Sequence, residues 1–330
     1  MSIRHILWDA AKVGNKKALP ILSFPAAQKM GVTVEEMVKS SALQAHAMEI
    51  VAHETSTVAA VSLMDLSIEA EAFGAQVRYS PSEVPAIVGQ LVSDEDEANA
   101  LDVPDLSAGR ALQCIEAVRT AKQRITDKPV ISGMIGPYSL AGRLMDVTEI
   151  MYMCFDEPET VHIVLDKAAQ YLIQYGQAMK NAGADGIMMA EPLAGILSPA
   201  MAEEFSMPYV KRIIDTLQDE SFVVIYHNCG NNVPLMLDSI YSLGAVAYHF
   251  GNAVDMRAVM QATPSNTLVM GNIDPAGQFA SGTVESITSA TRNLLNACGS
   301  YPNFIPSSGC DIPAHAKWEN IYAFFNAVEG

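Results

Sequence analysis

The 330-residue sequence predicts an α/β fold, a (β/α)8 barrel in which eight parallel strands are each followed by a helix. Short apolar runs recur along the chain, and longer segments with helical spacing follow them. The runs are almost continuously apolar, as expected of strands that are covered on both faces. An open doubly wound sheet is the alternative. No G-x-G-x-x-G motif follows the first runs, so a dinucleotide-binding version of that fold lacks its fingerprint.

Eight apolar runs are predicted to form the strands. In chain order they cover residues 20–24, 58–65, 130–136, 186–191, 222–229, 245–249, 267–272 and 303–308. The clearest helix between them covers 157–182, where apolar residues form one stripe and Gly183 follows as a stop signal. We therefore expect a single barrel domain over residues 1–330, with a helical extension at its N-terminus.

The stretch between the second and third predicted strands is longer than one βα unit requires. Within it, residues 93–107 contain six acidic residues and no basic residue. We interpret this segment as an acidic excursion from the barrel, and its simplest role is that of a solvated, solubilising face.

The charge of the chain is strongly negative, with 20 Lys and Arg against 37 Asp and Glu and a formal charge of −17. Such a charge repels phosphate backbones and anionic lipid surfaces, so we expect neither nucleic acid nor a membrane as a partner. No uncharged apolar run approaches the roughly 18 residues that span a bilayer, and there is no signal-peptide core. The five cysteines are an odd number, which does not suggest a disulfide framework. These observations predict a cytoplasmic protein in a reducing compartment.

Polar residues end several of the predicted strands, which is where reacting groups lie in a barrel. The second strand ends at Asp65, the third opens into a turn that contains Tyr138, the fourth ends at Glu191 and the sixth ends at His249.

The fifth predicted strand ends with His227 and Cys229, which lie two residues apart and therefore share one face of an extended segment. Cys310 follows the eighth predicted strand, and loops across a barrel mouth can bring it to the same place. One imidazole and two thiolates suit Zn²⁺, and three protein ligands with a fourth position open are typical of a catalytic zinc site. The alternative is a core histidine beside inert thiols. The remaining cysteines fall in predicted helices and are interpreted as inert packing residues: Cys114, Cys154 and Cys298.

Such a zinc site would be a modest Lewis acid, because two thiolates neutralise the charge of the ion. It would still hold an incoming thiol as a thiolate at neutral pH. A thiolate held in this way is a nucleophile that can accept a methyl group.

At these residues the sequence resembles the uroporphyrinogen decarboxylase superfamily, and within it the zinc-dependent methylcobamide:coenzyme M methyltransferase branch. The similar segments are MIGPYSLAGRL (134–144), HNCG (227–230), GNIDP (271–275) with the downstream SGT (281–283), and SSGCDIP (307–313). MDLSIEAEAFG (64–74) and LSPAMAEEFSMPYVKRI (197–213) are also similar, so the likeness extends over nearly the whole chain.

The resemblance implies a uroporphyrinogen decarboxylase-like barrel with a zinc ion held by a His-x-Cys…Cys set, which carries over onto His227, Cys229 and Cys310. It also implies that the zinc binds a small thiol such as coenzyme M, and that the methyl group arrives on the cobalt of a methylcorrinoid carried by a separate protein. The expected cofactors are thus Zn²⁺ and the protein-bound methylcorrinoid, and the expected partners are the corrinoid protein and a thiol acceptor. Arg143 and the Gly-rich turns are candidates to bind the sulfonate of such a thiol.

One departure from the family concerns the fourth zinc ligand. Close relatives often have an acidic residue after the sixth strand, where Gly251 aligns here, so the fourth ligand is open among water, His249 and Glu191. Glu191 and Asp65 are candidate catalytic residues that orient the thiol or accept its proton, with a structural carboxylate as an equal alternative for each. Tyr138 is a third candidate, as a hydrogen-bonding partner of the substrate.

Two other functions compete with methyl transfer. The decarboxylases resemble one another in an N-terminal Arg-rich segment that binds the carboxylates of a porphyrinogen, whereas residues 20–31 here contain no Arg. A decarboxylase would also leave the His-x-Cys…Cys set unexplained. The second alternative is a non-catalytic barrel that binds a corrinoid or tetrapyrrole. Turnover with methylcobalamin and a thiol distinguishes it from an enzyme.

Overall fold

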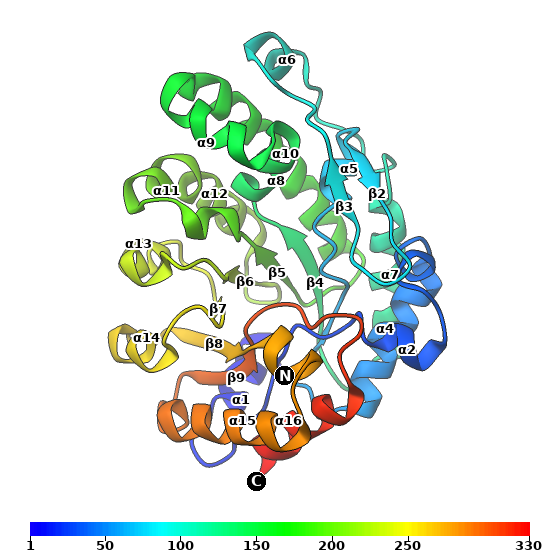
Figure 1. Cartoon of the computed structure of the whole chain (residues 1–330), viewed down its shortest axis with the longest axis vertical. Coiled ribbons are helices and arrows are strands. Elements are labelled where there is room, and N and C mark those ends of the chain that lie inside the picture. Colours follow the sequence, from blue (N-terminus) through cyan, green and yellow to red (C-terminus); the bar gives the residue numbers. More distant parts are fainter.

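The computed structural model describes all 330 residues, and its centre is a parallel sheet of seven strands. In spatial order these are β1 (Ala60–Val61), β4 (Val130–Ile135), β5 (Gly186–Ala190), β6 (Val223–Asn228), β7 (Ala247–Phe250), β8 (Leu268–Ile273) and β9 (Phe304–Ser308). Every neighbouring pair is parallel, and the strands are stacked in chain order (Figure 1). Seven of the eight predicted strands are therefore confirmed, and the curled parallel sheet is that of a (β/α)8 barrel.

The predicted strand at 20–24 is wrong as a regular strand, although the neighbouring residues complete the ring. The backbone N–H of Leu19 donates to the carbonyl of Pro306 in β9 at 3.1 Å, and the carbonyl of Ala18 accepts from the N–H of Val58 at 2.9 Å. Pro20 has no N–H and interrupts any ladder at this point. An extended segment thus bridges β9 and the chain leading into β1, without the hydrogen-bond pattern of a strand.

Helices surround this sheet in Figure 1. Their bounds are α1 (Ile3–Ala10), α2 (Ala26–Met30), α3 (Val34–Val38), α4 (Ser41–Glu54), α5 (Ile68–Ala72), α6 (Glu95–Ala100), α7 (Ala111–Arg124), α8 (Pro137–Met145), α9 (Val147–Asp156), α10 (Pro158–Asn181), α11 (Pro199–Phe205), α12 (Met207–Leu217), α13 (Leu237–Tyr241), α14 (Met256–Ala262), α15 (Val284–Cys298) and α16 (Trp318–Glu329). Short turns of helix cover Leu193–Ile196 (η1), Val233–Leu235 (η2) and Pro275–Ala280 (η3). The predicted helix 157–182 corresponds to α10, and Gly183 follows it with a left-handed φ of 99°, as its stop signal predicts. No helix is long and apolar enough to cross a membrane.

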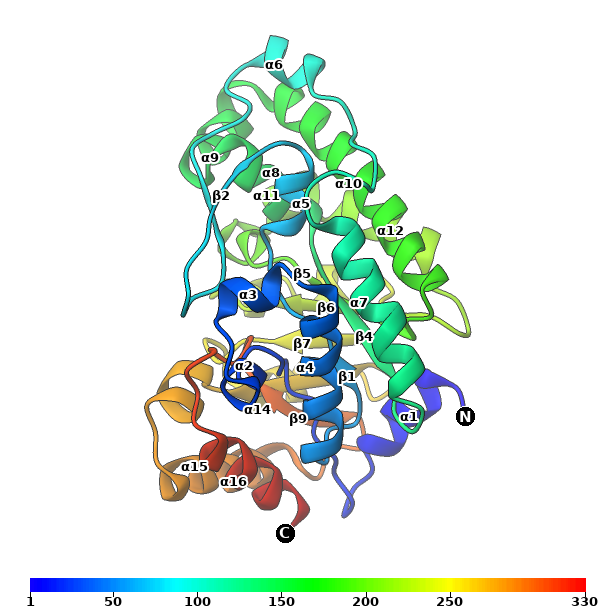
Figure 2. The same cartoon turned by 90° about the vertical axis from the view of Figure 1, so that its right-hand side faces the viewer.

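The helical extension α1 closes the amino-terminal end of the barrel. Ile3 and Leu7 are buried in one apolar cluster with strand residues that point into the barrel, such as Met188 and Ile225. Arg4 donates to the carbonyl of Asp219, just before β6, which places α1 where the strands begin. Figure 2 shows α1 on the opposite side of the strands from α2 and α3. Side chains thus fill the interior and one end, and polar groups are left to gather at the carboxyl ends of the strands.

The acidic excursion belongs to a longer insertion between β1 and β4. This insertion contains α5, an antiparallel pair formed by β2 (Gln76–Arg78) and β3 (Ala86–Val88), and α6. The two-stranded pair was not predicted. The acidic residues of α6 face solvent, but Lys167 of α10 donates to the carbonyls of Ala98 and Asn99 at 2.7 Å each. The excursion is therefore solvated on one face and attached to the barrel by the other.

Candidate metal centre

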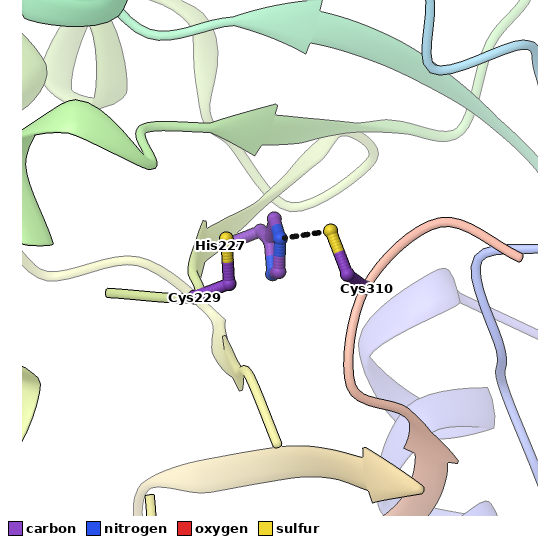
Figure 3. Close-up of side chains that lie close together, drawn as sticks. All are labelled: His227, Cys229 and Cys310. Carbon is purple, nitrogen blue, oxygen red and sulfur yellow. Dashed lines mark hydrogen bonds between the residues drawn. The ribbon is translucent and has the colours of Figure 1, made fainter. Parts of the chain in front are cut away.

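The structure brings His227, Cys229 and Cys310 together at the mouth of the barrel. His227 lies near the end of β6, Cys229 follows that strand directly, and Cys310 follows β9. One potential ligand atom from each residue lies within 4.8 Å of the others, and the Nε2 atom of His227 is 3.5 Å from the Sγ atom of Cys310 (Figure 3). His227 is buried, whereas both thiols are partly exposed. This is the arrangement that the sequence predicts for the metal ligands.

The alternation of β6 explains why His227 points inward. Val223 and Ile225 belong to the apolar cluster inside the barrel, and His227 follows them at the same two-residue period. Asn228, on the other face, accepts a hydrogen bond from the N–H of Gly230 at 3.0 Å and so fixes the turn that carries Cys229.

The loop after β7 contacts both of the turns that carry a cysteine. A Cβ atom at Gly251 would lie 2.6 Å from the Cα and Cβ atoms of Cys229, and one at Gly309 would lie 2.6 Å from the backbone nitrogen of Asn252. The loop thus touches the turn that holds Cys229 and the turn that holds Cys310. It also explains why no acidic side chain occupies position 251, because the backbone of Cys229 fills the space such a side chain needs.

We predict that Gly251→Ala weakens metal binding. The new methyl group displaces Cys229, and overpacking of this kind costs about 1–3 kcal/mol, equivalent to roughly 10-fold to 100-fold in affinity if the metal site takes the strain. Competition with a chromophoric chelator measures the zinc affinity, and Ala253→Ser in the exposed part of the same loop serves as the control. Unchanged zinc affinity in Gly251→Ala would show that this contact does not position Cys229.

The donor set fits a zinc ion. Zinc bonds of about 2.0–2.1 Å to nitrogen and 2.3 Å to sulfur place tetrahedral ligands about 3.4–3.8 Å apart, close to the 3.5 Å that separates His227 from Cys310. The pKa values of the two thiols diverge, because Cys310 hydrogen-bonds to Cys229: the pKa of Cys229 is lowered and the pKa of Cys310 is raised to about 12. Two adjacent thiolates need a cation between them, and a bound dication provides it.

His249, one candidate for the fourth ligand, already uses both ring nitrogens. Its Nδ1 atom lies 2.8 Å from Nδ1 of His227, and its Nε2 atom lies 2.7 Å from the hydroxyl of Ser307. Glu191, the other protein candidate, points away, because Ala190 packs inside the barrel and the next residue faces the outer side of the sheet. The group of potential ligands therefore contains three protein donors, from His227, Cys229 and Cys310.

Glu191 is fully buried and caps the first turn of α8. Its carboxylate accepts hydrogen bonds from the backbone N–H groups of Tyr138 at 3.0 Å and Ser139 at 2.6 Å, and from the Ser139 hydroxyl. Burial raises the pKa of Glu191 to about 7, although these hydrogen bonds oppose the shift. The phenol of Tyr138 is buried and lies 3.8 Å from the Sγ atom of Cys154. The catalytic roles predicted for both residues remain predictions, and their contacts are those of helix capping and packing.

Asp65 belongs to a buried ion-pair network. Its carboxylate accepts from Nη1 of Arg110 at 2.5 Å and from the hydroxyl of Ser67 at 2.6 Å, and Nε of Arg110 also donates to Glu71 at 2.6 Å. The Asp65 side chain has no exposed surface. Its predicted catalytic role also remains a prediction. Sequence reasoning missed Arg110, which has no motif around it and gains its importance only through tertiary contacts.

Glu69 is a further buried carboxylate, and sequence reasoning missed it. One oxygen accepts from the N–H of Ile135 at the end of β4, and the other has no hydrogen-bond partner. Because burial disfavours the charged form, the pKa of Glu69 is raised to about 7 from 4.5. The native state therefore favours neutral Glu69. The stability that the native state has with Glu69 protonated is fully present below pH 4.5 and is lost as the pH rises through about 7.

We predict that Glu69→Gln stabilises the protein relative to wild type at alkaline pH. The gain reaches about 3 kcal/mol at pH 9, since each pKa unit corresponds to about 1.4 kcal/mol, and it shrinks toward pH 5. Urea unfolding at pH 6 and pH 9 measures the difference, with the exposed Glu95→Gln as control. A stability difference that does not change with pH would contradict the raised pKa.

The three remaining cysteines are buried in α7, α9 and α15: Cys114, Cys154 and Cys298. Burial raises the pKa of each thiol, to about 12 for Cys114 and about 11 for the other two. This agrees with their interpretation as inert packing residues.

Comparison with known proteins identifies the family to which the chain belongs. The family model for uroporphyrinogen decarboxylase (URO-D) matches residues 17–330. The chain belongs to the uroporphyrinogen decarboxylase family. Among curated members, the methylcobamide:CoM methyltransferase MtbA of Methanosarcina mazei is 28% identical over 281 residues, which cover 80% of this chain and 81% of that protein. The uroporphyrinogen decarboxylase of Pseudoalteromonas atlantica is 27% identical over 287 residues, covering 82% and 78%.

Solved structures agree on the family fold. A methyltransferase from Methanosarcina mazei superimposes with a TM-score of 0.88 at 21% identity, covering 99% of this chain and 98% of that one. A B12-independent methionine synthase from Shewanella has a TM-score of 0.59 at 13% identity, with 94% of both chains covered. The family therefore includes methyltransferases and decarboxylases that are almost equally similar to this chain.

Proposed function

We propose that the protein is a zinc-dependent methyltransferase that moves a methyl group from a methylated corrinoid protein to a small thiol such as coenzyme M. The observation that carries this proposal is the convergence of His227, Cys229 and Cys310 within 4.8 Å at the open end of the barrel. The similarity to methylcobamide:CoM methyltransferases supports the same activity.

The residues of the chain supply binding and orientation. His227 and the two cysteines would hold zinc, which lowers the pKa of a bound thiol so that the thiol reacts as a thiolate. In the transfer, the thiol would release its proton to solvent and its sulfur would form a bond to the methyl carbon. The cobalt–carbon bond breaks with both electrons left on cobalt, so methyl-Co(III) becomes Co(I) and the thiol becomes a thioether. The barrel wall fixes the direction of approach, because the methyl group must arrive in line from the open side.

The partner in this proposal is a protein that presents the corrinoid over the mouth. Ile196 in η1 and Leu235 in η2, which follow β5 and β6, are 46% and 69% exposed. Exposed apolar side chains beside a site are common where a partner docks. We propose that these turns belong to the docking surface for the corrinoid protein.

Decarboxylation is the competing activity within the family. A porphyrinogen with eight carboxylates needs free cations, yet residues 20–31 contain no Arg, and Arg110 beside β1 is neutralised by Asp65 and Glu71. Decarboxylation would also leave the His/Cys/Cys group without a use. These points favour methyl transfer.

The test is turnover with free methylcobalamin and coenzyme M, comparing zinc-loaded and metal-free protein. Multiple turnovers that depend on zinc support the proposal. A spectral change of methylcobalamin that stops at one equivalent would instead indicate a binding barrel. Metal-independent decarboxylation of a porphyrinogen would indicate the decarboxylase activity.

A further inference from the structure

A buried chain of hydrogen bonds runs from His227 to the segment that closes the barrel. His227 Nδ1 lies 2.8 Å from His249 Nδ1, and His249 Nε2 lies 2.7 Å from the Oγ atom of Ser307. The Ser307 Oγ atom in turn lies 2.7 Å from the carbonyl oxygen of Leu19. His249 and Ser307 have no exposed surface, and His227 is 1% exposed. Water therefore does not compete for these contacts.

The positions of the protons along this chain follow from counting donors. A carbonyl oxygen can only accept, so the hydroxyl of Ser307 must donate its single proton to Leu19. Ser307 then has only lone pairs to offer to His249. The Nε2 atom of His249 must therefore carry a proton and donate it to Ser307.

The next link fixes the ring of His227. Its Nδ1 atom lies 2.8 Å from Nδ1 of His249 and 3.3 Å from the carbonyl oxygen of His249, and a carbonyl oxygen can only accept. Nδ1 of His227 therefore carries a proton and donates it to His249, whose ring has its own proton on Nε2 and can accept on Nδ1. His227 is consequently left with a bare Nε2 atom, and this is the atom that faces Cys310 at 3.5 Å.

We propose that His249 and Ser307 are positioning residues that hold His227 in the tautomer and ring orientation that direct the Nε2 lone pair at the metal. Neither residue belongs to the group of potential metal ligands. Partners of this kind orient a ligating imidazole, and their loss typically lowers metal affinity by about 10-fold to 100-fold. The inference rests on the proposed metal site, and it adds that the segment at Leu19 takes part in building that site.

The first experiment reads the tautomers directly. Long-range ¹H–¹⁵N correlation spectra of metal-free protein labelled with ¹⁵N-histidine distinguish bare from protonated ring nitrogens. We expect a proton on Nδ1 of His227 and on Nε2 of His249. A bare Nδ1 with a protonated Nε2 on His227 would overturn the proposal.

The second experiment measures zinc affinity in variants by chelator competition. His249→Leu removes the ring acceptor and leaves only the more distant carbonyl oxygen of residue 249, 3.3 Å from Nδ1 of His227, so it should weaken zinc binding by about 10-fold to 100-fold. His249→Asn, whose amide oxygen can accept from His227, should recover most of the loss of zinc affinity. In Ser307→Ala the spectra should no longer show the proton of His249 confined to Nε2. His162→Leu, in α10 and hydrogen-bonded to Tyr209, is the control. Wild-type affinity in His249→Leu, or an equal loss in His249→Asn, would refute the positioning role.

The experiments distinguish failure of the positioning role of His249 and Ser307 from failure of the proposed function. Wild-type protein that shows the expected tautomers and binds zinc but transfers no methyl group would refute the function and leave the positioning role intact. Zinc-dependent turnover combined with unchanged zinc affinity in His249→Leu would refute the positioning role and leave the function intact.

Discussion

Replacing Cys310 with alanine is expected to remove zinc from the protein and to abolish methyl transfer. Two ligands remain in this variant, fewer than the three protein ligands that catalytic zinc sites use. Loss of an outer-shell partner alone costs about 10-fold to 100-fold in affinity, so loss of a ligand should cost more than about 100-fold. Elemental analysis of protein purified without added metal should find about one zinc per wild-type chain and almost none in Cys310→Ala.

The control for this experiment is Cys298→Ala. Cys298 is buried in α15 and lies outside the group of potential ligands, so its replacement perturbs packing without touching the site. Zinc content in Cys298→Ala should equal that of wild type, and the double variant Cys229→Ser/Cys310→Ser should contain none. An unchanged zinc content in Cys310→Ala would refute the metal site. A wild-type chain that folds but cannot be loaded with zinc would refute the proposed function as well.

Replacing Arg110 with alanine is expected to cause the largest loss of stability among single substitutions of charged residues. Arg110 pairs with Asp65 at 2.5 Å and Glu71 at 2.6 Å, and its side chain is 5% exposed. Removing one partner of a buried pair typically costs about 3–5 kcal/mol, because the other partner remains buried and unpaired. Urea unfolding measures the loss.

Arg119→Ala is the matched control, in helix α7, which begins directly after Arg110. Arg119 pairs with Glu116 on the surface with its side chain 42% exposed, and exposed pairs contribute at most about 1 kcal/mol. Similar losses in Arg110→Ala and Arg119→Ala would contradict the role assigned to the buried network. The double variant Arg110→Met/Asp65→Leu removes the charges of Arg110 and Asp65 and leaves only the more exposed Glu71, so it should be more stable than Arg110→Ala.

The sequence predicted those parts of the structure whose signals are local. Strands such as 186–191 and the helix that ends before Gly183 are marked by periodicity and by a stop residue within the segment itself. The metal ligands were predictable for a similar reason, since the two-residue spacing of His227 and Cys229 carries its geometry with it. Cys310 was proposed from its place after the last predicted strand and was supported by the family resemblance, because no local pattern connects residues so far apart in the chain.

The parts that sequence reasoning missed depend on contacts between distant segments. The closing segment at 18–19 has no strand signal of its own and is held by Pro306 and Val58. Ser307 entered the sequence analysis only as part of the SSGCDIP segment, and its role depends on the distances from its hydroxyl to His249 and Leu19 in the fold. Arg110 and Glu69 likewise acquire their properties from burial, which a single sequence does not report.

Helix α1 closes the amino-terminal end of the barrel, and this closure determines the order in which substrates can bind in the proposed reaction. With one end filled by Ile3, Leu7 and the inward-pointing strand residues, both substrates of the proposed reaction would reach the candidate metal centre through the same opening. In that reaction a small thiol would have to enter before the bulky corrinoid protein covers the mouth, and the thioether would leave only after that protein dissociates. Steady-state kinetics should then follow a compulsory order, with excess corrinoid protein acting as a substrate inhibitor that traps thiol-free enzyme in a dead-end complex.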